Sequence, residues 1–387
     1  METKNKKFDF VVLGATGEEG NISSKDLLES GYSVLLCGRN KSRVKNLLEY
    51  KKAKFAYVDL NNVKKTASIL KSSGAKIAVN CAELRMNINA MKACLISGLH
   101  YLDLGGLQKM TIQQYKFDKN FKKRKLTALL GCGSTPGISN IMVAYAVDKM
   151  DFVEHIEVGF AWDSNIKKFI LPYSIESIVH ELTTDPIVLD NGKFKKTKAC
   201  SFEGALKFKG VEKQNTYCIV HSEVFTFKKY FEKKGLKFVH YKAGFPEHSF
   251  RVLDMLIKLG FGSKEPIKIN GINLRPIDFT REVLKKIARP KNYKETEDIW
   301  IKVYGKSDGK PKKIEMDCLV KTLNGWENYG SNINTGMSIS IMAQMLNKNL
   351  IKKEGITAPE EAVPSAPFFR ELNKRKIFVY ENDKKIN

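Results

Sequence analysis

Three glycines near the start of the chain stand where a strand turns into a helix, and they could hold phosphate groups. In FVVLGATGEEG, an apolar run is followed directly by Gly14, Gly17 and Gly20. Free backbone N–H groups and the positive end of a helix dipole attract a pyrophosphate at such a turn. The sequence therefore predicts dinucleotide binding by the loop residues Gly14, Thr16, Gly17, Glu18 and Gly20.

Two carboxylates stand inside this loop, at Glu18 and Glu19. Beside a pyrophosphate they would repel it. On the first turn of a helix, facing solvent, they would instead interact favourably with the helix dipole. The sequence leaves both interpretations open.

The next apolar run ends in LLCGRN, at the point where a Rossmann-type domain selects its cofactor. An acidic residue there would bind the ribose 2′-hydroxyl of NAD, whereas the guanidinium of Arg39 suits the 2′-phosphate of NADP. We therefore expect NADP rather than NAD, the alternative being that Arg39 is a surface arginine. Further cofactor contacts are expected where the third and fourth strands end, at Asp59, Leu60, Asn80, Cys81 and Ala82.

Polar residues also follow the fifth and sixth predicted strands. Asp103 either contacts the substrate or is a turn aspartate, and Cys132 either touches the nicotinamide or is a buried, inert thiol. Both are candidate catalytic residues. Ser134 and Thr135 precede a predicted helix start that suits a carboxylate, and with Asn140 they form a predicted substrate-binding loop.

Four further polar residues interrupt apolar stretches later in the chain: Tyr173, Glu181, His221 and Glu223. His221 is either a hydrogen-bonded core side chain or a proton-transfer group, because its ordinary pKa lies near neutrality. We predict a catalytic role for His221 and substrate contacts for Tyr173 and Glu223.

The elements that position these residues alternate from residue 8 to about 130. Apolar runs of strand length alternate with longer amphipathic stretches, a pattern typical of a doubly wound, Rossmann-type parallel sheet in the α/β class. The predicted strands are 8–13, 33–37, 54–57, 76–80, 101–104 and 126–130, and the predicted helices are 20–29, 42–50, 63–72, 87–97 and 111–123.

After residue 131 the spacing becomes irregular, which indicates a second, α+β domain. It should contain a helix at 138–149, strands at 155–161, 217–221 and 237–241, and a hairpin at 300–319 that turns at Asp308-Gly309. We expect a nucleotide-binding domain at 1–131, a second domain at 132–335, and a C-terminal segment, 336–387, that packs back on the first domain through a helix at 336–347 and the 359–375 stretch.

Composition narrows the possible partners. The net charge of +24 comes from 56 lysines and only 10 arginines, which is typical of a solvated surface rather than of base recognition, so no nucleic-acid partner is expected. No apolar run is long enough to span a membrane, and a cytoplasmic protein is expected. The seven cysteines show no Cys-x-x-Cys pair, which favours reduced thiols and predicts no metal site.

Longer segments resemble a known family. SGLHYLDLGG (97–106), GCGSTPGISNIMV (131–143), YSIESIVHE (173–181), HSEVFTF (221–227) and the late PEEAVP and FFRELNKRKI are similar to the saccharopine dehydrogenase family, which includes saccharopine reductases, lysine 6-dehydrogenases and carboxynorspermidine dehydrogenases. The resemblance covers nearly the whole chain. It implies a Rossmann domain completed by C-terminal residues, substrate binding and homodimerisation by the domain at 132–335, and hydride transfer between NAD(P) and the C–N bond of a small-molecule amino acid. In such a reaction Asp103 would hold a substrate ammonium or iminium group.

The resemblance does not fix the substrate. The stretch from Cys132 to Gly137 lacks the aspartate of the saccharopine-reductase type. We expect saccharopine or a lysine-derived imine, in lysine metabolism. A basic cleft would favour saccharopine, and carboxylates in the pocket would favour free lysine. Two alternatives are a non-catalytic NADP-binding sensor or scaffold, since a Rossmann fold alone specifies no chemistry, and a basic nucleic-acid binder.

Overall fold

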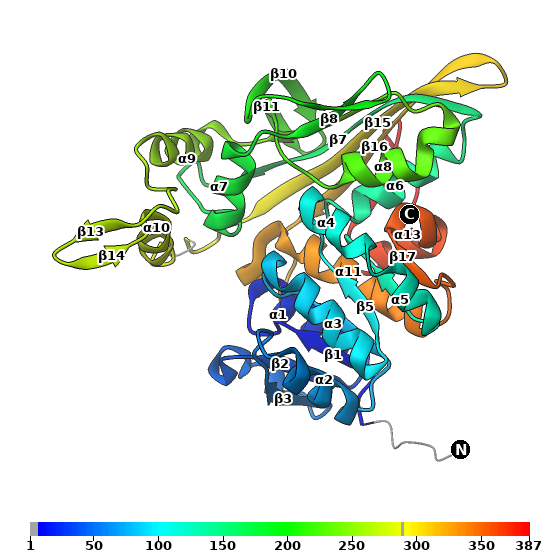
Figure 1. The fold of residues 1–387 in the computed structure, drawn as a ribbon. Helices are drawn as coiled ribbons and strands as arrows, with labels where there is room; N and C mark the ends of the chain where they lie inside the picture. The colour runs from blue at the N-terminus through cyan, green and yellow to red at the C-terminus, as the bar shows by residue number, and fades with distance from the viewer. Residues whose placement is uncertain (1–6, 288–289) are drawn as a thin grey trace.

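A seven-stranded parallel sheet organises the first third of the chain in the computed structural model, which describes residues 7–287 and 290–387 (Figure 1). The strand order is β17-β6-β5-β4-β1-β2-β3. The chain proceeds from β1 to β3 toward one edge of the sheet and from β4 to β6 toward the other, as in a doubly wound fold. The predicted α/β Rossmann class is confirmed. The six predicted strands are β1 Phe10–Leu13, β2 Val34–Gly38, β3 Ala53–Tyr57, β4 Ile77–Asn80, β5 His100–Asp103 and β6 Thr127–Leu129.

The helices of this domain depart from the prediction in two places. Residues 42–50 form no α-helix but two short 3₁₀-helices, η1 Lys41–Val44 and η2 Leu47–Glu49. Only Val44 and Leu47 are buried there, a three-residue spacing that suits 3₁₀ geometry. The predicted 111–123 helix breaks at Phe117. The helices are α1 Glu18–Glu29, α2 Val63–Ser72, α3 Asn87–Ser97, α4 Gln108–Tyr115 and α5 Asp118–Lys123.

A larger, mixed sheet forms the second domain, in the order β10-β11-β12-β7-β15-β16-β18-β19, with β8 paired to β12 and β9 paired to β8. The predicted hairpin is present but longer, and Asp308 and Gly309 take the positive φ that its turn requires. The strands are β7 Phe152–Ser164, β8 Ile187–Asp190, β9 Lys193–Lys196, β10 Ser201–Phe208, β11 Val211–Cys218, β12 Phe238–Gly244, β15 Glu295–Ser307 and β16 Lys310–Lys321.

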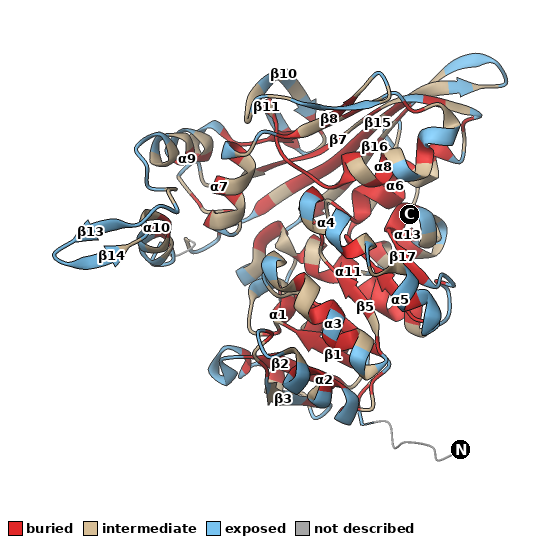
Figure 2. Ribbon diagram, viewed as in Figure 1, coloured by how far each residue is buried: buried red, intermediate tan, exposed pale blue. Residues whose placement is uncertain are grey.

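Helices cover the face of this sheet that is turned toward the first domain, and the strands in contact with them are buried (Figure 2). They are α6 Ile138–Val147, α7 Ile175–Thr183 and α8 Glu223–Phe231. Strand β11 ends at Cys218, so His221 lies in the connection to α8 rather than on the strand predicted at 217–221. Helices α9 Glu247–Lys258 and α10 Pro276–Leu284, with the hairpin of β13 Ile267–Ile269 and β14 Ile272–Leu274, form an arm that extends away from the sheet (Figure 1).

The C-terminal segment is shared between the two sheets. Helix α11, Ile333–Asn347, packs so closely on α1 that a Cβ at Gly336 would lie 2.5 Å from Ile22. Strand β17, Gly355–Thr357, joins the parallel sheet beside β6. After α12 Pro359–Ala362 and α13 Ser365–Lys374, strands β18 Phe378–Glu381 and β19 Lys384–Lys385 extend the larger sheet. The expectation that all of 336–387 packs on the first domain is therefore corrected for its last strands, which pair with β16.

No helix in the part of the chain that the structure describes is both long enough and apolar enough to cross a membrane.

Candidate functional site

The glycine loop is tightly constrained. A Cβ on Gly14 would lie 2.6 Å from the backbone nitrogen of Ala82, and one on Gly20 would lie 2.2 Å from the carbonyl oxygen of Gly14. Gly17 is different, because a Cβ there would meet nothing closer than 3.4 Å. It precedes α1, and no side chain caps the helix. A helix start without a side-chain cap can present its first N–H groups to a phosphate, so the loop fits a dinucleotide.

The end of β2 lies directly against this loop, because a Cβ on Gly38 would come within 2.5 Å of the Thr16 side chain. Arg39 follows and is exposed, and its guanidinium forms no hydrogen bond or ion pair with any described residue. Arg43, in η1, is likewise exposed, and the sequence analysis missed it. A pocket of about 390 Å³ opens beside the loop and is lined by Thr16, Gly17, Glu18, Asn21, Arg43, Asn46, Asn328 and Tyr329.

The two carboxylates of the loop point in different directions. Glu18 is exposed on the first turn of α1 and accepts a hydrogen bond from the Asn332 side chain (3.2 Å). Glu19 is half-buried and acts electrostatically on Cys81, whose pKa is raised chiefly by burial and further by Glu19. Glu18 therefore fits the solvent-facing interpretation, whereas Glu19 is turned toward the end of β4.

The other predicted cofactor contacts divide into accessible and enclosed positions. Asp59 accepts hydrogen bonds from the backbone and side-chain nitrogens of Asn61, and Leu60 is buried in the core. Asn80 is buried and donates to Asn87 and Tyr101. Cys81 and Ala82 are half-buried at the edge of the sheet beside Gly14, and Asp59 is also half-buried. A ligand can therefore reach these three residues, whereas Leu60 and Asn80 are enclosed.

Asp103 and Cys132 lie inside the protein and are fully buried. One carboxylate oxygen of Asp103 accepts from Asn87, Tyr101 and Gln114, and the other accepts from the backbone of Gly131. The carboxylate thus joins the ends of β5 and β6 and is surrounded by protein donors. Burial raises the pKa of the Cys132 thiol well above its ordinary value, so that the thiol stays neutral. Their predicted catalytic roles would need direct access that this burial does not provide.

The loop after β6 carries the predicted substrate residues to the domain boundary. Ser134 and Thr135 are half-buried, and the Ser134 hydroxyl accepts from Thr335 of α11 (3.0 Å). Asn140, one turn into α6, is fully enclosed. Its side chain accepts from the backbone of Gly137 (2.8 Å), which fixes the start of α6. Asn140 thus shapes the loop, and Ser134 and Thr135 remain reachable.

His221 is the centre of a buried polar cluster on the sheet face turned toward this loop. Its Nδ1 atom is hydrogen-bonded to Glu223, and its ring stacks on Tyr241 at 4.0 Å between centroids. Burial disfavours the imidazolium, but the charge and hydrogen bond of Glu223, together with the charge of Glu181, outweigh it and raise the pKa of His221. Its Nε2 atom bonds to no residue in the described ranges 7–287 and 290–387.

Glu181 and Tyr173 form the second pair of the cluster. The Tyr173 hydroxyl donates to the Glu181 carboxylate (2.5 Å), and both side chains are half-buried. Burial raises the pKa of Glu181 to about 7, although His221 and Tyr173 act in the opposite direction. Glu181 thus titrates near neutrality, within electrostatic range of the imidazole.

The cluster reaches α6 and the loop before it through hydroxyl groups. Ser139 of α6 donates to Glu223 (3.4 Å), and the Tyr241 hydroxyl lies beside Thr135. Three of the predicted residues, His221, Glu223 and Thr135, are thereby brought into one site with Tyr173 close by.

Two glutamates of this region were missed by the sequence analysis. Glu297 on β15 accepts from Asn334 (2.9 Å), and Glu360 on α12 accepts from Asn140 (2.8 Å). Burial raises the pKa of each carboxyl to about 7. Trp162 lies opposite Glu297 on the neighbouring strand β7, and its buried indole N–H has no partner among the described residues. Glu297 stands in no motif, and Glu360 lies within PEEAVP but carries no chemical signal of its own, so neither could have been singled out from the sequence.

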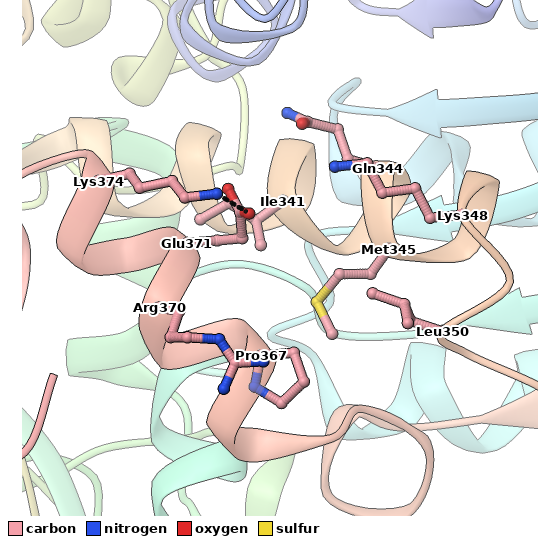
Figure 3. Close-up of a pocket in the computed structure, with 9 residues that line it drawn as sticks. All are labelled: Ile341, Gln344, Met345, Lys348, Leu350, Pro367, Arg370, Glu371 and Lys374. Carbon is pink, nitrogen blue, oxygen red and sulfur yellow. Dashed lines mark hydrogen bonds and ion pairs between the residues drawn. The ribbon is translucent and has the colours of Figure 1, made fainter.

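A second pocket, of about 150 Å³, lies between α11 and α13 (Figure 3). Its walls combine Ile341, Met345 and Pro367 with Lys348 and Arg370. It contains none of the predicted site residues. In the described part of the chain, no group of three or more His, Cys, Asp or Glu side chains is arranged to hold a metal ion.

Comparison with known proteins agrees with this architecture. Residues 10–129 match the saccharopine dehydrogenase NADP binding domain, and residues 133–377 match the saccharopine dehydrogenase C-terminal domain. The first match confirms the expectation of NADP. In the solved apo structure of histidine-tagged saccharopine dehydrogenase (L-Glu forming) from Saccharomyces cerevisiae, the same fold covers 98% of this chain and 100% of that chain, with a TM-score of 0.75 at 13% identity.

Two curated relatives carry names from amine chemistry. A carboxyaminopropylagmatine dehydrogenase from Synechocystis sp. is 23% identical over 94% of this chain and 95% of its own length. A carboxynorspermidine synthase from Vibrio cholerae is 23% identical over 68% of this chain and 66% of its own length. With both of its domains matched, the chain belongs to the saccharopine dehydrogenase family and is an NADP-binding oxidoreductase of that family.

Proposed function

We propose that this protein transfers a hydride between NADP(H) and the C–N bond of a carboxyl-bearing aliphatic polyamine. The observation that carries the proposal is the His221 site. Its imidazole is hydrogen-bonded to Glu223 and lies within the electrostatic range of Glu181, and its Nε2 atom bonds to no described residue. The family match supports the cofactor and the reaction class, and the residues of the cluster support the substrate class.

The charge of the cluster favours a cationic substrate. The charges of Glu223 and Glu181 act on the imidazole, Glu360 acts on Glu223, and Glu297 acts on the neighbouring phenols of Tyr173 and Tyr241. Desolvated carboxylates bind ammonium groups strongly and disfavour an anionic ligand. Saccharopine, with several carboxylates of its own, is thus a poorer fit than an amine-rich compound. The relatives named for carboxyaminopropylagmatine and carboxynorspermidine point to the same class.

The reaction would need little from the protein beyond orientation and one proton. Bound NADPH supplies the hydride to an electrophilic C=N carbon. His221 would hold its proton on Nε2 and donate it to the nitrogen as the C=N bond is reduced. Glu223 accepts from Nδ1 and so keeps Nε2 oriented toward the substrate. In the reverse direction, Nε2 would accept the same proton.

The remaining polar residues would position the two ends of the substrate. Glu181, held by Tyr173, and Glu297, held by Asn334, would each receive an ammonium group. The half-buried Ser134 and Thr135 would face its carboxylate beside the start of α6. The orphaned Trp162 N–H would gain a partner when the site fills with substrate or water.

A direct assay tests this function. The full chain is incubated with NADP⁺ and, in parallel, with carboxynorspermidine, carboxyaminopropylagmatine, saccharopine or lysine, and NADPH formation is followed by absorbance. We expect turnover with a carboxylated polyamine and a much lower kcat/KM with saccharopine. A preference for saccharopine would contradict the proposed substrate class. NADPH binding without turnover on any amine would favour the non-catalytic alternative.

A further inference from the structure

The pocket between α11 and α13 is built from one face of each helix (Figure 3). Within each helix the lining residues follow a three-and-four spacing, which places them in a single stripe. The stripes are Ile341, Gln344, Met345 and Lys348 on α11, and Pro367, Arg370, Glu371 and Lys374 on α13. We call the space between these two stripes the C-terminal pocket.

The turn that ends α11 adds Leu350 to the lining of the pocket. Asn349 takes a left-handed backbone conformation (φ 57°), and the N–H group of Leu350 donates to the carbonyl oxygen of Met345 (2.9 Å). This bond is typical of a Schellman turn, in which the residue after the left-handed one folds back against the last turn of the helix. Leu350 is 45% exposed, whereas the next residue, Ile351, is buried. Leu350 therefore belongs to the pocket and not to the core.

The lining offers an apolar surface to a ligand. Ile341 and Met345 are at most 2% exposed, and Pro367 is half-buried. With Leu350 they surround much of a space of about 150 Å³. Apolar cavities of about this size take up a ring as large as benzene. The volume therefore suits a small apolar body and is too small for a long acyl chain.

Two positive charges at the pocket are not neutralised within the protein. Lys348 and Arg370 are exposed, and their side chains form no hydrogen bond or ion pair with any residue of the ranges 7–287 and 290–387. The carboxylate of the lining, Glu371, is already paired with Lys374 (2.7 Å) and Arg375 (3.0 Å). The pocket thus has an excess of positive charge beside its apolar surface.

The two unpaired cations come from opposite sides of the pocket. Figure 3 shows Lys348 extending from α11 and Arg370 extending from α13, with Met345 in the space between the helices. A guanidinium binds a carboxylate through two parallel hydrogen bonds, and an ammonium adds a point charge. A carboxylate held by both would leave the rest of its molecule against Met345.

The C-terminal pocket is separate from the sites described above. Gln344 donates to Ser30 (3.3 Å), so the pocket lies beside the last turn of α1, whereas the glycine loop precedes the first turn. Helix α1 has 12 residues and therefore spans about 18 Å. Asn334, which bonds Glu297 of the catalytic cluster, lies about 16 Å before Met345 along α11.

We propose that the C-terminal pocket binds a small organic anion with an apolar body, of the class of aromatic or short aliphatic carboxylates. The two unpaired cations select the charge, the apolar lining selects the body, and the volume limits its size. This inference goes beyond the proposed function and does not depend on it, because no residue of the pocket takes part in the proposed reaction.

NMR spectroscopy of the full chain, with methionine labelled with ¹³C at its methyl group, tests the proposal. The Met345 resonance is assigned by its absence in Met345→Leu. Benzoate is the probe, and benzyl alcohol and benzylamine present the same ring with no charge or a positive charge. We expect benzoate to shift the Met345 resonance saturably, with a Kd on the order of 1 mM, because the bound ring lies against the methyl group. Benzyl alcohol should bind at least about fivefold more weakly, and benzylamine should leave the resonance unchanged.

The double variant Lys348→Gln/Arg370→Gln tests the role of the cations. It should weaken benzoate binding by at least about fivefold, because exposed ion pairs contribute modestly. The matched control is Lys64→Gln/Lys92→Gln, which removes two exposed charges on α2 and α3 and should bind benzoate like the wild type. All four positions are exposed, and thermal unfolding shows that each variant is folded.

Four results would overturn the proposal. The first is a Met345 resonance that does not move at about 20 mM benzoate, well above the expected Kd. The second is benzylamine or benzyl alcohol binding as tightly as benzoate. The third is an equal effect of the two double variants. The fourth is a saturable shift with inorganic phosphate at the same concentrations, which would assign the pocket to a free inorganic anion without an apolar body.

Discussion

The imidazole of His221 lies flat on the phenol ring of Tyr241, with an angle of 4° between the two planes. The stack fixes the tilt of the imidazole, and Glu223 fixes its rotation, so that Nε2 has one direction. A proton donor held in this way needs no reorganisation before it acts.

We predict that His221→Gln lowers kcat by roughly 10²–10⁴-fold, the usual contribution of a positioned acid or base. NADPH affinity should be unchanged, because the ring lies in the second domain and away from the glycine loop. Steady-state kinetics with the substrate found in the amine screen, alongside fluorescence titration of NADPH, measure both. Tyr241→Phe keeps the stacked ring and serves as the control. Loss of less than about tenfold in His221→Gln would show that the imidazole is only structural.

The buried carboxylates predict a pH dependence of substrate binding. Glu181 and Glu297 have pKa values of about 7, so they gain their negative charge as the pH rises through neutrality. We expect kcat/KM for a polyamine substrate to increase between about pH 6 and 8, because a cation binds to the ionised form. In Glu297→Gln this increase should become shallower. The same profile in wild type and variant would mean that Glu297 does not meet the substrate's charge.

Glu360, another buried carboxyl, lowers the stability of the substrate-free protein at high pH. The pKa of Glu360 is raised from its ordinary 4.5 to about 7, so the folded state binds more protons than the unfolded state between these values. Its contribution to the free energy of unfolding therefore falls as the pH rises across that window, by about 1–3 kcal/mol. Glu360→Gln keeps an acceptor for Asn140 and should raise the melting temperature at pH 8 but not at pH 4. Calorimetry at both pH values decides this, and an equal change at both would contradict it.

From the positions of Arg39 and Arg43 we predict a preference for NADPH over NADH. Charge-assisted hydrogen bonds contribute about 1.5–3 kcal/mol, so Arg39→Asp should weaken NADPH binding by roughly 10- to 100-fold and affect NADH less. Arg43→Asp should act in the same direction. Arg370→Asp, an exposed arginine on α13, controls for the change in net charge. Equal losses for NADPH and NADH in Arg39→Asp would show that Arg39 does not contact the 2′-phosphate.

The C-terminal segment is tied to the first domain by a buried ion pair. Arg375 donates to both carboxylate oxygens of Asp26 on α1, at 2.7 and 2.9 Å, and both side chains are at most 10% exposed. Arg375→Met should cost about 3–5 kcal/mol of unfolding free energy, because it leaves the Asp26 charge buried without its partner.

The neighbouring Lys374→Met is the control for that change, since it removes only an exposed pair with Glu371 and should cost at most about 1 kcal/mol. Urea titration of both variants measures the difference. Asp26→Asn in the Arg375→Met background removes the orphaned charge and should restore part of the loss. No recovery would indicate that Arg375 acts through packing instead of charge.

The sequence determined the parts of this protein that depend on local order along the chain. Six parallel strands, the glycine turn before α1 and the position of Arg39 follow from short apolar runs and from residues that only particular backbone conformations accept. The motifs 97–106 and 131–143 also indicated the family correctly. Such signals are local, so they can be recognised without knowing which segments meet.

Only the tertiary structure showed which segments and side chains, distant in the sequence, lie next to one another. Strand β17 is three residues long and gains its place by pairing with β6, more than two hundred residues earlier. Asp103 has a site-like position in sequence but is enclosed by four donors. Glu297 and Glu360 are unremarkable in sequence, yet folding brings them to Asn334 and Asn140 and desolvates them. Burial and long-range pairing depend on the whole packed chain. The sequence could therefore name His221 as one candidate among several, but only the fold showed that it lies at the centre of a charged cluster.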